Sequence, residues 1–78
     1  MSKKGQIKKA IDEIEREIAA YERKRERSQT AIMRAMLAGK KASREDELYF
    51  TTFSNLIDED REKLRQLYAE LEALKNKK

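Results

Sequence analysis

The sequence contains no cysteine, histidine, tryptophan or proline, and its only glycines are Gly5 and Gly39. Without cysteine and histidine, disulfides, thiolate zinc sites and histidine-based metal sites are excluded. The commonest general base and the thiol nucleophile of enzymes are missing too. Two glycines are also too few for a phosphate-binding loop. We therefore expect no enzyme activity, no catalytic residues, no metal, no cofactor and no small-molecule substrate.

Long apolar runs are also missing. No stretch approaches the ~20 residues of a membrane span. The N-terminal sequence MSKKGQIKK lacks the apolar region that follows the basic residues of a secretory signal. These absences predict a cytoplasmic protein with no membrane partner. The 78 residues suffice for a single domain, and 44% charged with 38% hydrophobic residues is typical of long helices and coiled coils.

The net charge of +4 is unevenly distributed along the chain. Residues 1–44 carry 13 basic and 6 acidic side chains, whereas residues 45–78 carry 6 basic and 9 acidic ones. A basic first half and an acidic second half favour packing of one against the other, or against a second copy. The alternative is an ordinary helical surface of mixed charge.

Two series of mostly apolar residues recur at alternating spacings of three and four, which is the period of a coiled-coil seam. The first occupies positions 7, 11, 14, 18, 21, 25, 28, 32 and 35, and the second occupies positions 50, 53, 57, 60, 64, 67, 71 and 74. Between them, Gly39 suits the left-handed residue that ends a helix, and Ser43 with Asp46 suits the cap of the next one. The sequence predicts helices over about 6–38 and about 44–75, joined by a turn over about 39–43.

The two series also fit a register. In an antiparallel hairpin the residue numbers of facing positions have a constant sum, and the pairs 7 with 74, 14 with 67, 21 with 60 and 28 with 53 obey this rule. Their midpoint falls in the turn predicted independently from the capping residues. We therefore expect an all-α fold, a long antiparallel two-helix hairpin that spans residues 1–78 as one domain. Because a lone hairpin buries only one stripe per helix, we expect it to form a homodimeric four-helix bundle or to bind another protein.

Three seam positions are polar or amphipathic and lie close together in this register. Tyr21 faces Asp60, and Arg25 is one layer away. These residues predict a polar seam layer, which costs stability but can specify register and partner geometry.

The segments next to the turn hold more apolar residues than a two-helix seam can use. This excess predicts a partner interface made of Met33, Met36, Leu37, Tyr49 and Phe53. Methionine is adaptable and recurs on surfaces that bind helical partners. The alternative is that these side chains fill a wider core or a homodimer core. The predicted function is a non-enzymatic protein-interaction module, an adaptor, co-chaperone or regulator that self-associates or binds a helical segment of a partner.

A basic patch supports a different hypothesis. Arg23, Lys24, Arg27, Lys40 and Lys41 could contact the phosphates of RNA or DNA, with strongly salt-dependent binding. The alternative is an ordinary solvated helix surface, because acidic residues interrupt the patch and no nucleic-acid recognition motif is present. A third hypothesis is a structural subunit of a coiled-coil assembly.

In length and hairpin layout the chain resembles the Rop family of plasmid copy-number regulators. That resemblance implies a dimer of hairpins, a four-helix bundle, that binds RNA. In size and in its paired helices joined by a short turn, the chain is also similar to the small co-chaperones that hold type III secretion needle subunits. This second resemblance implies a protein partner.

Overall fold

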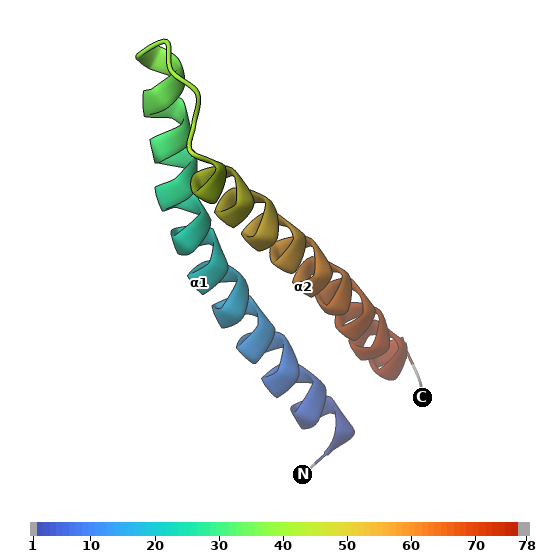
Figure 1. Ribbon diagram of the computed structural model, residues 1–78. Helices are drawn as coiled ribbons and strands as arrows, with labels where there is room; N and C mark the ends of the chain where they lie inside the picture. Colours follow the sequence, from blue (N-terminus) through green and yellow to red (C-terminus); the bar gives the residue numbers. More distant parts are fainter. Residues whose placement is uncertain (1, 77–78) are drawn as a thin grey trace.

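The computed structural model describes residues 2–76, which form two helices, α1 (Lys3–Leu37) and α2 (Arg44–Asn76). The helices run antiparallel and pack on each other, with both ends of the chain at the same end of the molecule (Figure 1). This arrangement confirms the predicted helical hairpin. The molecule is a rod of 61 × 18 × 15 Å, since the 35 residues of α1 alone rise about 52 Å.

The first helix begins at Lys3, earlier than the sequence predicted. Ser2 has an extended backbone and acts as the N-cap. Its hydroxyl oxygen accepts a hydrogen bond from the backbone N–H of Gly5 at 3.1 Å. This bond satisfies one of the free N–H groups of the first turn, so the helix can include the lysines that precede the first seam residue.

The turn follows from two local signals in the sequence. Gly39 adopts a φ of 70°, a left-handed conformation that glycine reaches without steric cost. Its N–H donates to the Met36 carbonyl at 3.0 Å, and the N–H of Lys40 donates to the Ala35 carbonyl at 2.8 Å. These two bonds form a Schellman motif, which ends α1.

A reciprocal cap begins the second helix, as predicted. The Ser43 hydroxyl accepts a hydrogen bond from the Asp46 N–H at 3.1 Å and donates one to the Asp46 carboxylate at 2.8 Å. Glu45, Asp46 and Glu47 fill the first turn, where their negative charge is favourable next to the positive end of the helix dipole.

The seam is confirmed, but it is packed unevenly along the hairpin. Every predicted seam position is buried or half-buried. The hydrophobic core lies towards the chain ends, where the buried Ile7, Ile11 and Leu71 contact Leu64, Leu67 and Leu74. Ile57, in the middle, is completely buried.

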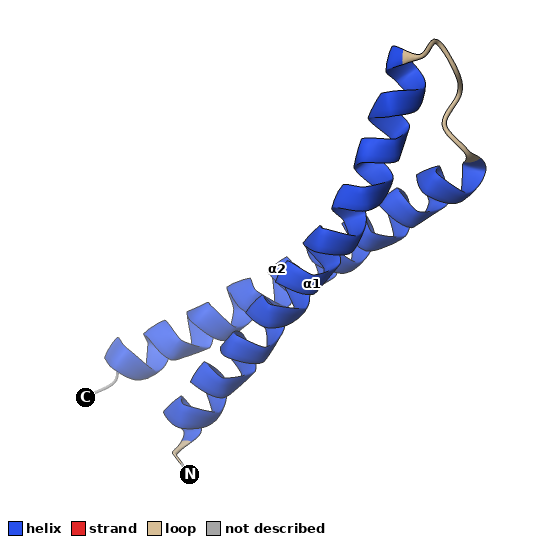
Figure 2. Ribbon diagram, turned by 90° about the vertical axis from the view of Figure 1, so that its left-hand side faces the viewer, coloured by secondary structure: helices blue, strands red, loops and turns tan. Residues whose placement is uncertain are grey.

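Towards the turn the helices separate. They cross near the middle of the hairpin and diverge on the side of the loop (Figure 2). Ile32, Ala35, Phe50 and Phe53 are accordingly only half-buried, although they occupy seam positions. Within residues 2–76 neither helix has an apolar stretch long enough to cross a membrane.

Candidate functional site

The half of the hairpin next to the turn, residues 29–56, exposes most of the large apolar side chains. We call this region the turn half. Of the six large hydrophobic side chains that are exposed within residues 2–76, five lie in it: Met33, Met36, Leu37, Leu48 and Tyr49. Met36 is 69% exposed and Leu37 is 87% exposed. The turn half is therefore where this rod has apolar surface that its own two helices do not cover.

The methionine side of the turn half contains an open cavity of 620 Å³, here called the turn cavity. It is lined by Ile32, Met36, Lys40, Lys41, Ala42, Arg44 and Glu47. The lining combines the apolar Ile32, Met36 and Ala42, here called the floor, with four charged residues, here called the rim, of which three are basic. None of its three basic residues forms an ion pair within residues 2–76.

The aromatic residues of the turn half lie on different surfaces. Leu48, Tyr49, Thr52 and Phe53 line an apolar groove of 320 Å³ on α2, here called the aromatic groove. Glu47, which belongs to the turn cavity, is only two residues from Tyr49. Side chains two positions apart on a helix do not face the same way. The two cavities therefore mark two flanks of the hairpin: Met36 lies at the turn cavity, Tyr49 and Phe53 lie at the aromatic groove, and Met33 and Leu37 line neither of them.

Phe53 belongs more to the fold than to a free surface. Its ring centroid lies 5.7 Å from that of Tyr21 and 5.2 Å from that of Tyr49, both tilted. The Lys24 ammonium lies 5.6 Å from the centre of the same ring, a cation–π contact. Phe53 thus anchors a row of aromatic rings across the two helices and leaves Tyr49 as its exposed member.

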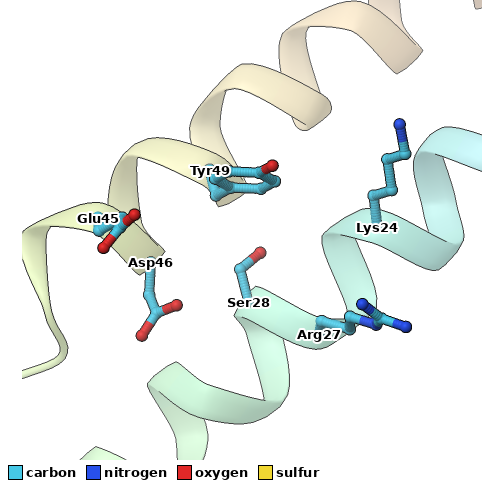
Figure 3. Close-up of a pocket in the computed structure, with 6 residues that line it drawn as sticks. All are labelled: Lys24, Arg27, Ser28, Glu45, Asp46 and Tyr49. Atoms are coloured by element: carbon cyan, nitrogen blue, oxygen red, sulfur yellow. The ribbon is translucent and has the colours of Figure 1, made fainter.

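A charged groove of 340 Å³ separates the helices beside Tyr49 (Figure 3). Lys24 and Arg27 of α1 lie on one side, and Glu45 and Asp46 of α2 lie on the other. No ion pair within residues 2–76 joins the two sides. The groove places basic residues of the first half of the chain opposite acidic residues of the second half.

The five basic residues proposed to contact nucleic acid are spread over the charged groove, which Lys24 and Arg27 line, an outer surface of α1 and the turn cavity. Arg23 and Arg27 line a shallow cavity of 510 Å³ on the outer surface of α1, together with Glu26, Thr30 and Arg34. Lys24 leans over Phe53, whereas Lys40 and Lys41 lie at the turn cavity. The structure therefore groups only part of the predicted patch, in which Arg34, another basic residue of the turn half, lies with Arg23 and Arg27.

The polar seam layer contains Tyr21 and Asp60, as predicted, but its other members differ. The Asp60 side chain is almost completely buried, its residue being 3% exposed, and its Oδ2 has no hydrogen-bond partner. Its Oδ1 lies 3.7 Å from the Lys63 ammonium. Glu17 of α1 comes within hydrogen-bonding reach of the same carboxylate. We call these four residues the carboxylate layer.

Arg25 lies outside this layer. Its guanidinium lies 5.9 Å from the centre of the Phe50 ring, and it forms no ion pair with Asp60 in the described part of the chain. The register places Arg25 one layer nearer the turn than Tyr21, and there the flat guanidinium can stack on an aromatic face. Sequence reasoning missed Glu17, although its position one helical turn before Tyr21 was a usable signal.

The charges of the carboxylate layer raise two pKa values. The hydrogen bond to Asp60, and then the Coulombic repulsion by its carboxylate, raise the pKa of Glu17 above the ordinary 4.5. Burial is the main reason that the pKa of the Tyr21 hydroxyl is also raised, with the negative charges of Glu17 and Asp60 adding to it. The carboxyl groups of Glu17 and Asp60 thus lie close together, and the Oδ2 atom of Asp60 has no hydrogen-bond donor.

Comparison with known proteins found no matching family model, no similar curated protein and no similar solved structure.

Proposed function

We propose that this hairpin is a non-enzymatic protein-interaction module that associates through the apolar residues of its turn half. The observation that carries the proposal is the clustering there of five exposed large hydrophobic side chains, while the buried core lies at the opposite end. Large exposed apolar patches on a small protein are typical of interaction sites. A second copy of the chain, or a helical segment of a partner protein, would cover them.

The surface area supports association. The chain exposes 6481 Å², whereas a compact monomer of 9.2 kDa would expose about 4,900 Å². The difference is on the order of 1,600 Å² for one chain, about twice the ~800 Å² that each partner buries in a standard protein interface.

Light scattering over a range of protein concentrations tests the proposal. We expect the wild-type chain to have twice its monomer mass of 9.2 kDa. One double variant targets each flank: Met33→Asp with Met36→Asp, and Leu48→Asp with Tyr49→Asp. All four side chains are exposed, so the helicity should persist while at least one of the two variants becomes monomeric.

The matched control changes two exposed residues with the same spacing as the two methionines, Gln66→Asp with Ala69→Asp, far from the turn. It should keep the wild-type mass. The proposal fails for self-association if all three double variants have the mass of the wild type. If the wild-type chain is monomeric at every concentration, self-association is ruled out and binding to another protein remains. Binding of a designed helical peptide tests that possibility.

A nucleic-acid-binding regulator is the second candidate. It is favoured by the grouping of Arg23, Arg27 and Arg34 around one cavity on the outer surface of α1, none of them in an ion pair within residues 2–76. Binding of this kind should weaken steeply with salt, because each phosphate contact releases counterions. Charge reversal by Arg27→Glu with Arg34→Glu should abolish it. Binding that survives this double variant would contradict the candidate.

A further inference from the structure

The turn cavity combines apolar side chains with a group of basic ones. Its floor includes Ile32 and Met36, and the Met36 side chain is exposed. Its rim carries Lys40, Lys41 and Arg44, against a single acidic residue, Glu47. A purely apolar ligand would cover the floor but leave the three basic side chains without a counter-charge. A purely acidic ligand would pair with these side chains but leave the apolar floor exposed to water.

The local fold keeps the cavity open. The Schellman motif at Gly39 turns the chain sharply at the end of α1, and the Ser43 cap begins α2 only five residues later. The loop between them takes a path separate from α1, where the helices diverge (Figure 2). Because both ends of the loop are held by hydrogen bonds, the basic residues stay at the rim of the apolar floor.

We propose that the turn cavity binds an amphipathic helix of a partner protein whose apolar stripe is flanked by acidic residues. This inference rests on the proposed function and names the chemistry of its partner. Apolar side chains of the helix would contact Ile32 and Met36, and its carboxylates would pair with Lys40, Lys41 and Arg44. Methionine adapts to the side chains that it meets, which suits a surface that receives a helix.

The charges argue against a second copy at this particular surface. A two-fold symmetric contact places the same patch of both copies face to face. Such a contact at the turn cavity would bring Lys40, Lys41 and Arg44 of one copy against the same three cations of the other. A separate acidic helix meets no such repulsion, so self-association belongs to the other flank, which carries Leu48 and Tyr49.

Two designed helical peptides test the inference by fluorescence polarisation. Both carry the same leucine stripe at positions three and four apart, and one is flanked by glutamates and the other by lysines. We expect saturable binding of the glutamate peptide, about tenfold or more tighter than that of the lysine peptide. Raising NaCl from about 0.05 M to about 0.5 M should weaken it several-fold, because screening shortens the reach of the exposed charges.

Variants of the chain locate the binding site. Met36→Asp and the double variant Lys40→Glu with Lys41→Glu should each weaken binding of the glutamate peptide about tenfold or more. Lys8→Glu with Lys9→Glu is the charge-matched control, since both lysines are exposed at the far end of α1. Circular dichroism should show that every variant keeps the helicity of the wild type.

Several outcomes would overturn the inference. They are no saturable binding of the glutamate peptide, equal binding of both peptides, or an equal loss in the Lys8/Lys9 control. Polyglutamate that binds as tightly as the amphipathic peptide would show that the apolar floor is not used. An oligonucleotide that displaces the peptide, with its own binding unaffected by Met36→Asp, would assign the rim to phosphates instead. If the peptide fails while light scattering shows a dimer that the Leu48/Tyr49 variant breaks, the partner chemistry is wrong and the proposed function stands.

Discussion

Replacing Asp60 by asparagine should stabilise the hairpin at neutral pH. The Asp60 carboxylate is buried with one oxygen lacking a partner, and an unsatisfied buried polar group costs about 1–3 kcal/mol. The amide has the same shape, removes the negative charge next to Glu17 and can donate a hydrogen bond to its carboxylate. Against this, the exposed Lys63 loses a contact of 3.7 Å, which is worth about 0.2–1 kcal/mol for such a pair.

The net expectation is an unfolding free energy higher by about 1–2 kcal/mol. For a domain of this size, each kcal/mol corresponds to roughly 4–8 °C in Tm. Thermal unfolding followed by far-UV circular dichroism, at one fixed protein concentration, measures the shift. Asp58→Asn is the matched control, because that side chain is 74% exposed and only pairs loosely with Arg61 at 3.8 Å. It should change Tm little.

The stability of the wild type and that of Asp60→Asn should differ in their pH dependence. The pKa of Glu17 is raised in the folded chain, first by its hydrogen bond to Asp60. The folded state therefore binds this proton more tightly than the unfolded state does. Its stabilisation is fully present below the ordinary pKa of 4.5 and is lost as the pH rises through the raised value. The wild type should therefore lose stability as the pH rises above about 4.5. This loss should be smaller in Asp60→Asn.

The reasoning is refuted if Asp60→Asn lowers Tm at neutral pH. That result would mean that the Asp60 carboxylate already has a stabilising donor. An unchanged pH dependence in the variant would likewise show that Glu17 does not share its proton with Asp60.

Four further substitutions test the fold by unfolding measurements. Gly39→Ala should lower the unfolding free energy by about 1 kcal/mol. No atom lies within 4 Å of the added Cβ, but the φ of 70° strains a residue that has a side chain. An unchanged stability would contradict the Schellman turn. Ser43→Ala should cost about 1 kcal/mol by removing the N-cap of α2, and no loss would mean that water caps the helix as well. Ile57→Ala should cost about 2–5 kcal/mol, because this side chain is 0% exposed, whereas Leu37→Ala should leave the stability of the isolated hairpin nearly unchanged.

Parts of the candidate site were also predictable from the sequence, although its grouping was not. The excess of apolar residues near the turn indicated Met33, Met36, Leu37 and Tyr49, which are exposed, and their role as a partner interface stays a prediction. The positions of Met36 at the turn cavity and of Tyr49 at the aromatic groove were not foreseen, because they depend on which flank of the seam each side chain takes. Leu48 was left out of the predicted interface, although it directly precedes Tyr49 and lies off the seam stripe.

The sequence by itself determined the hairpin. The seam, the Gly39 turn and the Ser43 cap depend on spacings of three and four residues and on backbone preferences, which act within one or two helical turns. Only the tertiary structure decided that Glu17 joins Asp60 while Arg25 stacks on Phe50. Those contacts depend on distances between the two helices. The divergence of the helices near the turn likewise decided how much of the apolar surface stays open to a partner, since exposure there is set by interhelical packing and not by any local pattern.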